Sequence, residues 1–350
     1  MDIISEAFGV TKKNEAVTKY TLKNDQLEVE IITYGGILRK ITTPDRSGRM
    51  ENVLIGLPTV TDYEEKPGTV GALVGRVAGR IAKGEFVLDG KTWPLSINHK
   101  DRNTLHGGAE GFSRRVWTAE ELRGDDYVGL SLTLESPDGD QGFPGNVKVK
   151  VNYILKDADL LIDYAGESDR PTFLNLTNHA YFNLSGDCKK TIGDHLLKLN
   201  ASKYSAVDED TLPVEARDVA ETPFDFRSWK KIGKALSADD PQIAIVGGGI
   251  DHGFVIDKKE NKYAGALKDP DSGRKMEVYS DQNIVVVYTA NYGDGIGPME
   301  NGKICKKHQA ICLETQNFTD IFRFAPEKLK ITDKNHPYKQ KTLFRFSVER

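Results

Sequence analysis

The 350-residue sequence has little cysteine and little histidine. Its three cysteines, Cys188, Cys305 and Cys312, cannot all pair within one chain, and none lies in a CxxC motif. We therefore expect free thiols in a reducing compartment. The opening segment MDIISEAFGVTKKNEAV has no basic start followed by an apolar stretch, so it does not resemble a signal peptide. Together these features predict a cytoplasmic protein.

Long apolar runs and an excess of positive charge are also absent. Near the end of the chain the longest apolar run is Ile284 to Tyr288, far shorter than the about 20 residues that a membrane-spanning helix needs. The formal net charge is -4, from 48 Lys and Arg against 52 Asp and Glu. This balance predicts neither a nucleic-acid partner nor a membrane partner. It is compatible with a small polar substrate.

Several motifs of metal and cofactor chemistry are missing. The sequence has no HExxH motif, no close pair of histidines and no Cys/His cluster, so it predicts no protein-bound metal. It has no GxSxG elbow. The segment GDGIG at 293–297 is not GxGxxG, and GALVGRVAGRIAKG at 71–84 is not followed by GK[ST]. We therefore expect no nucleotide and no other cofactor.

Alternation of apolar and polar residues dominates what is present. The segment KYTLKNDQLEVEIITYGG predicts a hairpin that turns at Asn24-Asp25, and NVKVKVNYILKDADLLIDYAG predicts two strands around Lys156-Asp157. RKMEVYSDQNIVVVYTANY repeats this pattern of two strands. Helical periodicity is scarce and is best in a short stretch from Trp229 to Leu236. Many strands and few short helices predict an all-β sandwich or barrel. No linker or internal repeat interrupts residues 1–350, which predicts a single domain.

Three of the seven histidines have unusual neighbours. His106 lies in NTLHGG, where two glycines would let a substrate approach closely. His179 lies in NLTNHAYFNL, among amides and aromatic residues. His252 lies in GGGIDHGF; we expect this histidine to be structural and its neighbour Asp251 to be functional.

Two further segments contain candidate charged residues. Glu314 lies in the largely apolar strand of QAICLETQNF, where a buried carboxylate is costly unless it is compensated. It could form a buried ion pair with an arginine, or act as a general base whose pKa is tuned by burial. Of Arg76 and Arg80, we expect one to form a structural ion pair and the other to bind a ligand oxygen.

Six segments, in this order over most of the chain, resemble the aldose 1-epimerase (galactose mutarotase) family. They are GRVAGRIAKGEFVLDGK, NTLHGG, SPDGDQGFPG, NLTNHAYFNLSG, DHGF and CLETQNFTD. The resemblance implies a large antiparallel β-sandwich of the galactose mutarotase type, with a sugar-binding cleft. It implies that Glu314 is the general base and His179 the general acid. The sugar-binding positions it implies are His106, Arg80, Asp251, Gln282 and Gly79.

Gly79 is a departure from the family. Members commonly have Asn before the equivalent arginine, in ANRIA, whereas this chain has AGRIA. One contact to the sugar is therefore expected to be missing.

The resemblance implies an enzyme that interconverts the α and β anomers of free hexoses such as galactose and glucose, without a metal or cofactor. Its expected partner is a small-molecule aldose, and we expect a monomer or a weak homodimer. A hexose-6-phosphate 1-epimerase is an alternative, with Arg76, Arg114 and Arg115 available for a phosphate. A non-catalytic sugar-binding protein and a glycosidase are further alternatives. A glycosidase needs two suitably spaced acids, and the sequence offers one strong candidate besides Asp251.

Overall fold

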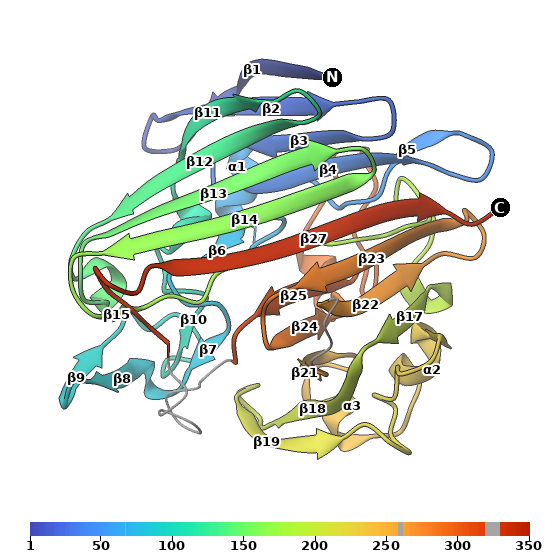
Figure 1. The fold of residues 1–350 in the computed structure, drawn as a ribbon. Coiled ribbons are helices and arrows are strands. Elements are labelled where there is room, and N and C mark those ends of the chain that lie inside the picture. The colour runs from blue at the N-terminus through green and yellow to red at the C-terminus, as the bar shows by residue number, and fades with distance from the viewer. Residues whose placement is uncertain (67, 258–261, 319–329) are drawn as a thin grey trace.

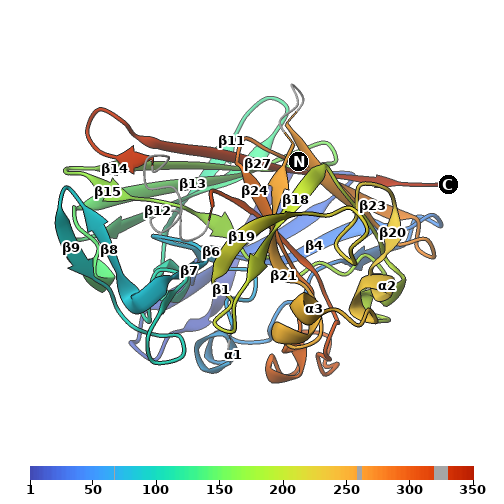
Figure 2. The same ribbon diagram turned by 90° about the horizontal axis from the view of Figure 1, so that it is seen from below.

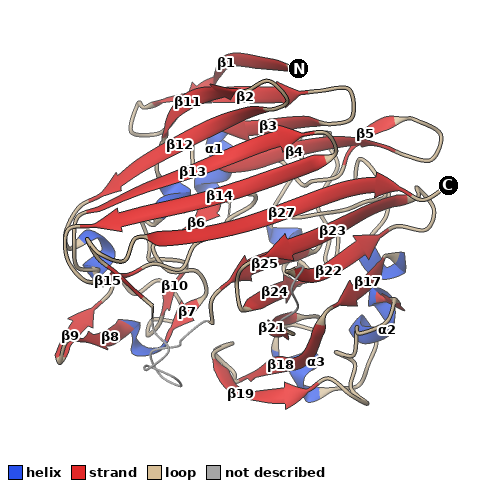
Figure 3. Ribbon diagram, in the orientation of Figure 1, coloured by secondary structure: helices blue, strands red, loops and turns tan. Residues whose placement is uncertain are grey.

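The computed structural model describes residues 1–66, 68–257, 262–318 and 330–350 (Figure 1). Antiparallel strands form most of this structure, as the colouring by secondary structure shows (Figure 3). The helices of the described residues are short: α1 (Val60–Glu65), α2 (Ile232–Leu236) and α3 (Pro241–Ile245). Single 3-10 turns occur at Ala82–Gly84, Phe112–Arg114, Asp140–Gly142, Ile192–Asp194 and Gly293–Gly295.

Three larger sheets organise the chain. The nine-stranded sheet has the order β11 (Thr118–Arg123), β12 (Val128–Ser136), β13 (Val147–Lys156), β14 (Asp159–Ser168), β27 (Tyr338–Val348), β23 (Arg274–Ser280), β22 (Tyr263–Lys268), β17 (Leu196–Leu199) and β20 (Lys230–Lys231). An N-terminal five-stranded sheet has the order β1 (Asp2–Val10), β2 (Ala16–Lys23), β3 (Glu28–Ile32), β4 (Ile37–Pro44) and β5 (Met50–Asn52). A second five-stranded sheet has the order β19 (Pro213–Asp218), β18 (Ala201–Val207), β21 (Asp251–Ile256), β24 (Ile284–Tyr288) and β25 (Cys312–Gln316).

Short two-stranded ribbons complete the described sheets. They are β7 (Arg80–Ile81) with β10 (Thr104–Leu105), β6 (Leu73–Val74) with β16 (Thr177–Asn178), β8 (Glu85–Leu88) with β9 (Lys91–Pro94), and β15 (Thr172–Phe173) with β26 (Ile331–Thr332).

The N-terminal sheet packs face to face against the nine-stranded sheet (Figures 1 and 2). The main hydrophobic core contains side chains of both layers, such as Val29 and Ile31 of β3 with Leu132 of β12 and Val151 of β13. Along β13 every second side chain is buried and those between are exposed or half-buried. This is the pattern of a strand with one face on a core. The predicted all-β antiparallel sandwich with few short helices is confirmed.

The strands predicted in the first two segments are confirmed, and in each segment the two strands pair with each other. β2 pairs with β3, and the Asn24 side chain closes the turn by accepting hydrogen bonds from the backbone N–H groups of Gln26 and Leu27. β13 pairs with β14 around Asp157. The short helix predicted between Trp229 and Leu236 is α2, and the three cysteines are free and buried.

The two strands predicted in the third segment are also confirmed, but they do not pair with each other. β23 and β24 are both strands, but β23 pairs with β22 and β27, whereas β24 pairs with β21 and β25 in another sheet. The chain changes sheets at the turn between them. There Ser280 Oγ donates to the Lys341 carbonyl, and the Lys341 N–H donates to Asp281. Alternation indicates which face a residue occupies but does not identify the neighbouring strand.

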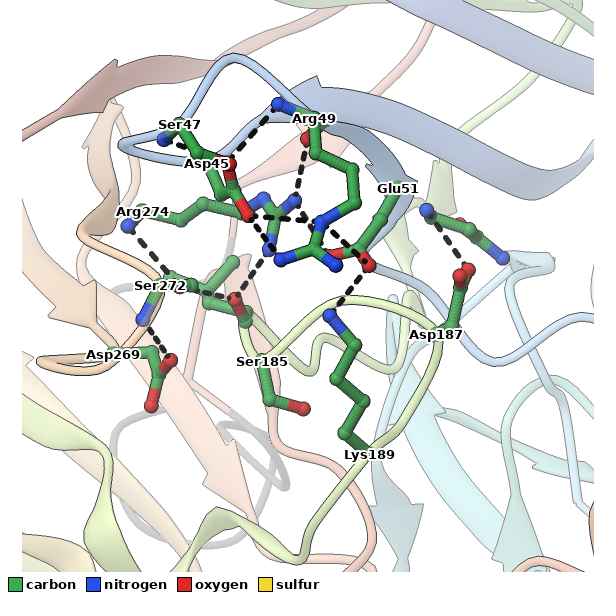
Figure 4. A network of polar contacts seen from close by, with 12 residues as sticks. Asp45, Ser47, Arg49, Glu51, Ser185, Asp187, Lys189, Asp269, Ser272 and Arg274 are labelled. Carbon is green, nitrogen blue, oxygen red and sulfur yellow. Dashed lines mark hydrogen bonds and ion pairs between the residues drawn. The ribbon is translucent and has the colours of Figure 1, made fainter.

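A buried ionic network joins the N-terminal sheet to the nine-stranded sheet (Figure 4). Arg274, at the start of β23, is 2% exposed and donates to Glu51 Oε2 of β5 at 2.9 Å. The same guanidinium donates to the carbonyls of Thr43, Arg49 and Leu184. Lys189 also pairs with Glu51. A buried charge is tolerated here because its hydrogen-bonding capacity is met.

Replacing Glu51 with Gln is expected to destabilise the fold by about 3–5 kcal/mol, because it leaves the buried Arg274 without its counter-charge. Urea unfolding measures this change. The matched control is Glu121→Gln, since Glu121 forms an exposed pair with Arg123 that should contribute less than about 1 kcal/mol. Equal, small effects of the two substitutions would contradict a structural role for the network.

Candidate active site

One face of the second five-stranded sheet forms the floor of a large cleft. Side chains alternate along a strand, so residues two apart point to the same side. The cleft-lining pairs are Ser205 and Val207 of β18, Asp251 and Gly253 of β21, Val286 and Tyr288 of β24, and Glu314 and Gln316 of β25. The strand register places Gly253, Val286 and Glu314 in one row across the floor.

The opposite wall comes from the first half of the chain. It contains the β7–β10 ribbon, where Arg80 pairs with Leu105, and the adjoining residues His106, Gly108 and Gly79. His179 and Tyr181 follow β16 and also line the cleft. The cleft has a volume of about 650 Å³, which is in the usual range for a small-molecule site.

Glu314 and His179 meet at the bottom of this cleft. Glu314 Oε1 lies 3.5 Å from His179 Nε2, and the two residues are 3% and 6% exposed. The backbone of His179 bonds to Gly71 and Ala72 on both sides. Its ring stacks on Tyr181 at 5.1 Å between ring centres. His179 is therefore held in a fixed orientation towards the carboxyl group.

Burial opposes charge on both members of this pair. It lowers the pKa of His179 to about 4, with a smaller lowering by Arg80. Burial raises the pKa of Glu314 well above its usual range, the Asp251 carboxylate raises it further, and Arg80 opposes this shift. Such a close pair titrates as a unit. The buried ion pair with an arginine that Glu314 might have formed is not seen in the described residues, where its ion-pairing neighbour is His179.

His106 is fixed in one tautomer by Gly79. The Gly79 N–H donates to His106 Nδ1 at 3.2 Å, and the His106 N–H donates to the Gly79 carbonyl at 2.9 Å. Burial, followed by the nearby His179 and Arg80, lowers the pKa of His106 well below its usual value. The ring is therefore neutral with its proton on Nε2, which makes Nε2 a hydrogen-bond donor. Both residues have positive φ, +79° for Gly79 and +53° for His106.

Arg80 and Asp251 join the two walls. Arg80 Nη2 lies 3.3 Å from Asp251 Oδ2, and both side chains remain partly exposed to the cleft. Arg76 behaves differently from the predicted structural ion pair. It is 2% exposed and donates to Ser136 Oγ and to four backbone carbonyls, those of Ser136, Pro137, Pro144 and Gly145. Carbonyl oxygens, not a carboxylate, thus bind its guanidinium, and Arg76 is not available to a ligand.

The structure brings Glu314, His179, Arg80, His106, Asp251 and Gly79 to this cleft. Gln282 is not among the lining residues. It lies in the turn where the chain changes sheets, and its amide donates to Asp281 Oδ1 at 3.0 Å. The structure therefore does not bring Gln282 together with the other predicted sugar-binding residues.

Two other expectations concerned the glycines that follow His106 and the role of His252. Gly107 is required by packing, because a Cβ there would lie 2.0 Å from the Gly75 carbonyl oxygen; Gly108 does line the cleft. His252 is structural, as expected. It is buried outside the cleft lining, with Nε2 at 3.2 Å from Gln242 Oε1.

Tyr181, Tyr288 and Gln316 are among the cleft residues that sequence reasoning missed. Tyr181 and Gln316 each follow a predicted catalytic residue by two positions, and strand alternation could have identified Gln316 from Glu314. Tyr288 is found only through the pairing of β24 with β21, which places it opposite Asp251.

The described residues contain neither a metal-binding cluster nor a membrane-spanning helix. Within residues 1–66, 68–257, 262–318 and 330–350, no group of three His, Cys, Asp or Glu side chains could hold a metal ion. Over the same residues no helix has the length and apolar character needed to cross a membrane.

Known proteins share both the sequence and the fold. The family model described as "Aldose 1-epimerase" matches residues 18–345. The chain is 39% identical to a human protein named "Galactose mutarotase" over 337 residues, covering 95% of this chain and 94% of that protein. It is 33% identical to "Aldose 1-epimerase" of Escherichia coli over 323 residues, 91% of each chain. The crystal structure of a galactose 1-epimerase from Lactobacillus acidophilus superposes with a TM-score of 0.87 at 29% identity, covering 100% of this chain and 99% of that one.

Nitrogen-15 NMR of labelled histidine is expected to show His106 as the neutral Nε2–H tautomer, because the Gly79 N–H occupies Nδ1 and burial disfavours the cation. Its ring resonances should not change between about pH 5.5 and pH 8. A His106 ring that titrates near the ordinary value of about 6.5, or one protonated at Nδ1, would contradict the derived geometry.

Proposed function

The chain belongs to the aldose 1-epimerase family and is an aldose 1-epimerase, an enzyme that interconverts the α and β anomers of free sugars, and we propose that Glu314 and His179 carry its proton transfers. The observation that supports this assignment is the 3.5 Å separation of Glu314 Oε1 and His179 Nε2 in the cleft. Ring opening requires the C1 hydroxyl to lose a proton while the ring oxygen gains one. Both oxygens are bonded to C1, so two groups this close can serve them together.

In the proposed cycle Glu314 is the general base and His179 the general acid. Ring opening takes the proton of the C1 hydroxyl to Glu314 and delivers a proton from His179 to the ring oxygen. C1 becomes an aldehyde, rotates about the C1–C2 bond and presents its other face. On closure the two proton transfers reverse, so the pair returns to its starting state. No redox change and no covalent intermediate is involved.

The opposed pKa shifts suit this cycle. Before ring opening the pair is a carboxylate beside an imidazolium, and after ring opening it is a carboxylic acid beside a neutral imidazole. The number of protons on the pair is the same in both states. Burial disfavours the charged state, so it shifts the balance towards the neutral pair that forms on ring opening.

The remaining cleft residues are proposed to hold the sugar. Asp251 offers acceptors and Arg80 offers donors at the junction of the two walls, while His106 offers a donor at Nε2. At Gly79 only the backbone is available, and its N–H is already engaged by His106. We therefore propose that this chain lacks the side-chain contact that Asn makes in other members of the family.

Galactose and glucose are the proposed substrates, and galactose appears in the names of several relatives. Polarimetry on freshly dissolved α-D-galactose and α-D-glucose tests this assignment. The 6-phosphates provide the comparison for the hexose-6-phosphate alternative. Of its three candidate arginines, Arg76 is bound to carbonyls, Arg115 pairs with Asp140 at 3.1 Å, and Arg114 lines the cleft. Faster turnover of the free sugars supports the proposal, and faster turnover of the 6-phosphates contradicts it.

We further propose that residues 1–350 act as a single domain, that the protein is a monomer or a weak homodimer, and that it functions in the cytoplasm. The main core includes side chains from Leu22 to Phe346, and free buried thiols suit a reducing compartment.

Replacing Glu314 with Gln should lower kcat by about 10²- to 10⁴-fold, because the shape is kept and the base is lost. His179→Asn should lower kcat by a similar factor, since its proton matters mainly as the ring opens. KM should change much less in both variants. Initial rates of mutarotation measure these effects, with His106→Asn as a comparison in which KM should respond more than kcat. A Glu314→Gln enzyme of normal kcat would refute the assignment.

The pH profile of kcat/KM should be flat around neutrality. The active pair holds one proton, and acid inactivates it by adding a second one. When the first proton is on Glu314, the second enters at His179, whose pKa is lowered to about 4. Activity should therefore persist as the pH falls below about 6.5, the ordinary histidine value, and be lost only near the lowered pKa. The alkaline limit is set by loss of the proton from the pair, which the raised pKa of Glu314 moves above the ordinary carboxyl range. An acid limit near about pH 6.5 would show that His179 is not shielded as described.

A further inference from the structure

Unpartnered polar atoms gather in the cleft. Twelve buried side-chain nitrogen and oxygen atoms of the described residues have no hydrogen-bond partner there. Four of the twelve belong to three cleft-lining residues: Arg80 Nε, His179 Nδ1, and both Oε1 and Nε2 of Gln316. Buried polar atoms almost always have partners in native proteins. The four unpartnered atoms in the cleft therefore indicate polar groups that pair with a bound ligand.

Gln316 is the member of this set that no step of the reaction uses. It is 1% exposed and lies two residues after Glu314 on β25, on the same face of the strand. Its neighbours in sequence are satisfied. Thr315 Oγ1 bonds to Thr342 Oγ1 at 2.5 Å, and Asn317 Oδ1 accepts from Asn283 at 2.8 Å. Of these three side chains, Gln316 is the one that lines the cleft and the one whose polar atoms have no partner.

We propose that Gln316 is a specificity-determining residue that forms hydrogen bonds with a hydroxyl group of the aldose other than the reacting C1 hydroxyl. This inference rests on the proposed roles of Glu314 and His179, which place C1 beside them. Residues two apart on a strand are separated by about 6.6 Å, so the Gln316 amide faces a part of the sugar away from C1. A hydroxyl both donates and accepts, and a primary amide supplies the matching acceptor and donors.

The free-energy cost of the buried amide differs between the enzyme without sugar and the enzyme with sugar bound, and this difference explains a glutamine at this position. Without a partner, a buried amide lowers stability, and an apolar side chain of similar shape would remove that cost. With the sugar bound, the same amide meets a hydroxyl that is also withdrawn from water. Gln316 then distinguishes a sugar with that hydroxyl from one without it, because the mismatch leaves a buried polar group unpaired.

The test replaces Gln316 with Leu and measures mutarotation kinetics together with thermal unfolding. KM for galactose should rise by about 10-fold, as expected when a buried hydroxyl loses its partner. The kcat value should stay within about 2-fold, because a remote hydroxyl changes little during ring opening. The melting temperature without sugar should be unchanged or higher.

A series of 2-, 3-, 4- and 6-deoxy-D-galactose identifies the hydroxyl. In the wild type, each missing hydroxyl that is bound should raise KM. In Gln316→Leu, the penalty at one position should largely disappear and the other penalties should remain, as in a double-mutant cycle. Penalties that are the same at every position in both enzymes would overturn the proposal.

Gln309→Leu is the matched control. Gln309 is buried too, but its amide donates to the carbonyls of Cys188 and Lys190 at 3.2 and 3.0 Å, and it does not line the cleft. This control should melt at a lower temperature with an unchanged KM. The same behaviour in Gln316→Leu, or misfolding of both Gln316→Leu and Gln316→Ala, would make Gln316 structural and overturn the inference.

The proposed function fails separately. An active Glu314→Gln enzyme contradicts the roles of Glu314 and His179, whatever Gln316 does. If Glu314→Gln is inactive while Gln316→Leu has a normal KM and normal deoxy-sugar penalties, only the role of Gln316 is contradicted.

Discussion

The withdrawal of Glu314 and His179 from water is the constraint on which the rest of the site depends. Each group alone would be costly to bury in its charged form. Side by side they share one proton, and burial shifts their pKa values in opposite directions. The proton affinity of the carboxyl thereby rises relative to that of the imidazole, which in the proposed cycle favours proton transfer to Glu314 as the ring opens. Asp251 and Arg80 act on this balance from opposite sides, since the former raises the pKa of Glu314 and the latter lowers it.

Rigid β structure on both sides keeps this pair in place. Glu314 lies on β25, whose neighbour β24 supplies Val286 directly opposite it. His179 follows β16, where the Asn178 amide donates to the Gly71 carbonyl and to the Tyr153 hydroxyl. Residues on strands are positioned more exactly than residues on free loops. The cleft lies between segments from the two halves of the chain, so its geometry depends on the packing of the whole sandwich, including the distant Arg274 network.

The sequence predicts strands well and strand partners less well. Alternation in the sequence identified β2, β3, β13 and β14, and in β13 and β14 it matches buried residues that alternate with more exposed ones. It also identified β23 and β24 as strands, but it could not show that they belong to different sheets, since a side-chain pattern contains no information on which sheet a strand joins. The same limit explains Gln282, which lies in the turn between these two strands and not in the cleft. Glu314 and His179 could be predicted because a carboxylate in an apolar strand and a histidine among amides are unusual. Tyr288 has no such signal.

The central claim is that Glu314 and His179 act as one unit. Saturation-transfer NMR of galactose at anomeric equilibrium measures the α-to-β exchange rate for the wild type, for Glu314→Gln, for His179→Asn and for the double variant. Groups that serve a single concerted step are strongly non-additive. The double variant is therefore predicted to be no more than a few-fold slower than the slower single variant. A double variant whose loss equals the product of the two single losses would show that the two residues act independently and would contradict the account.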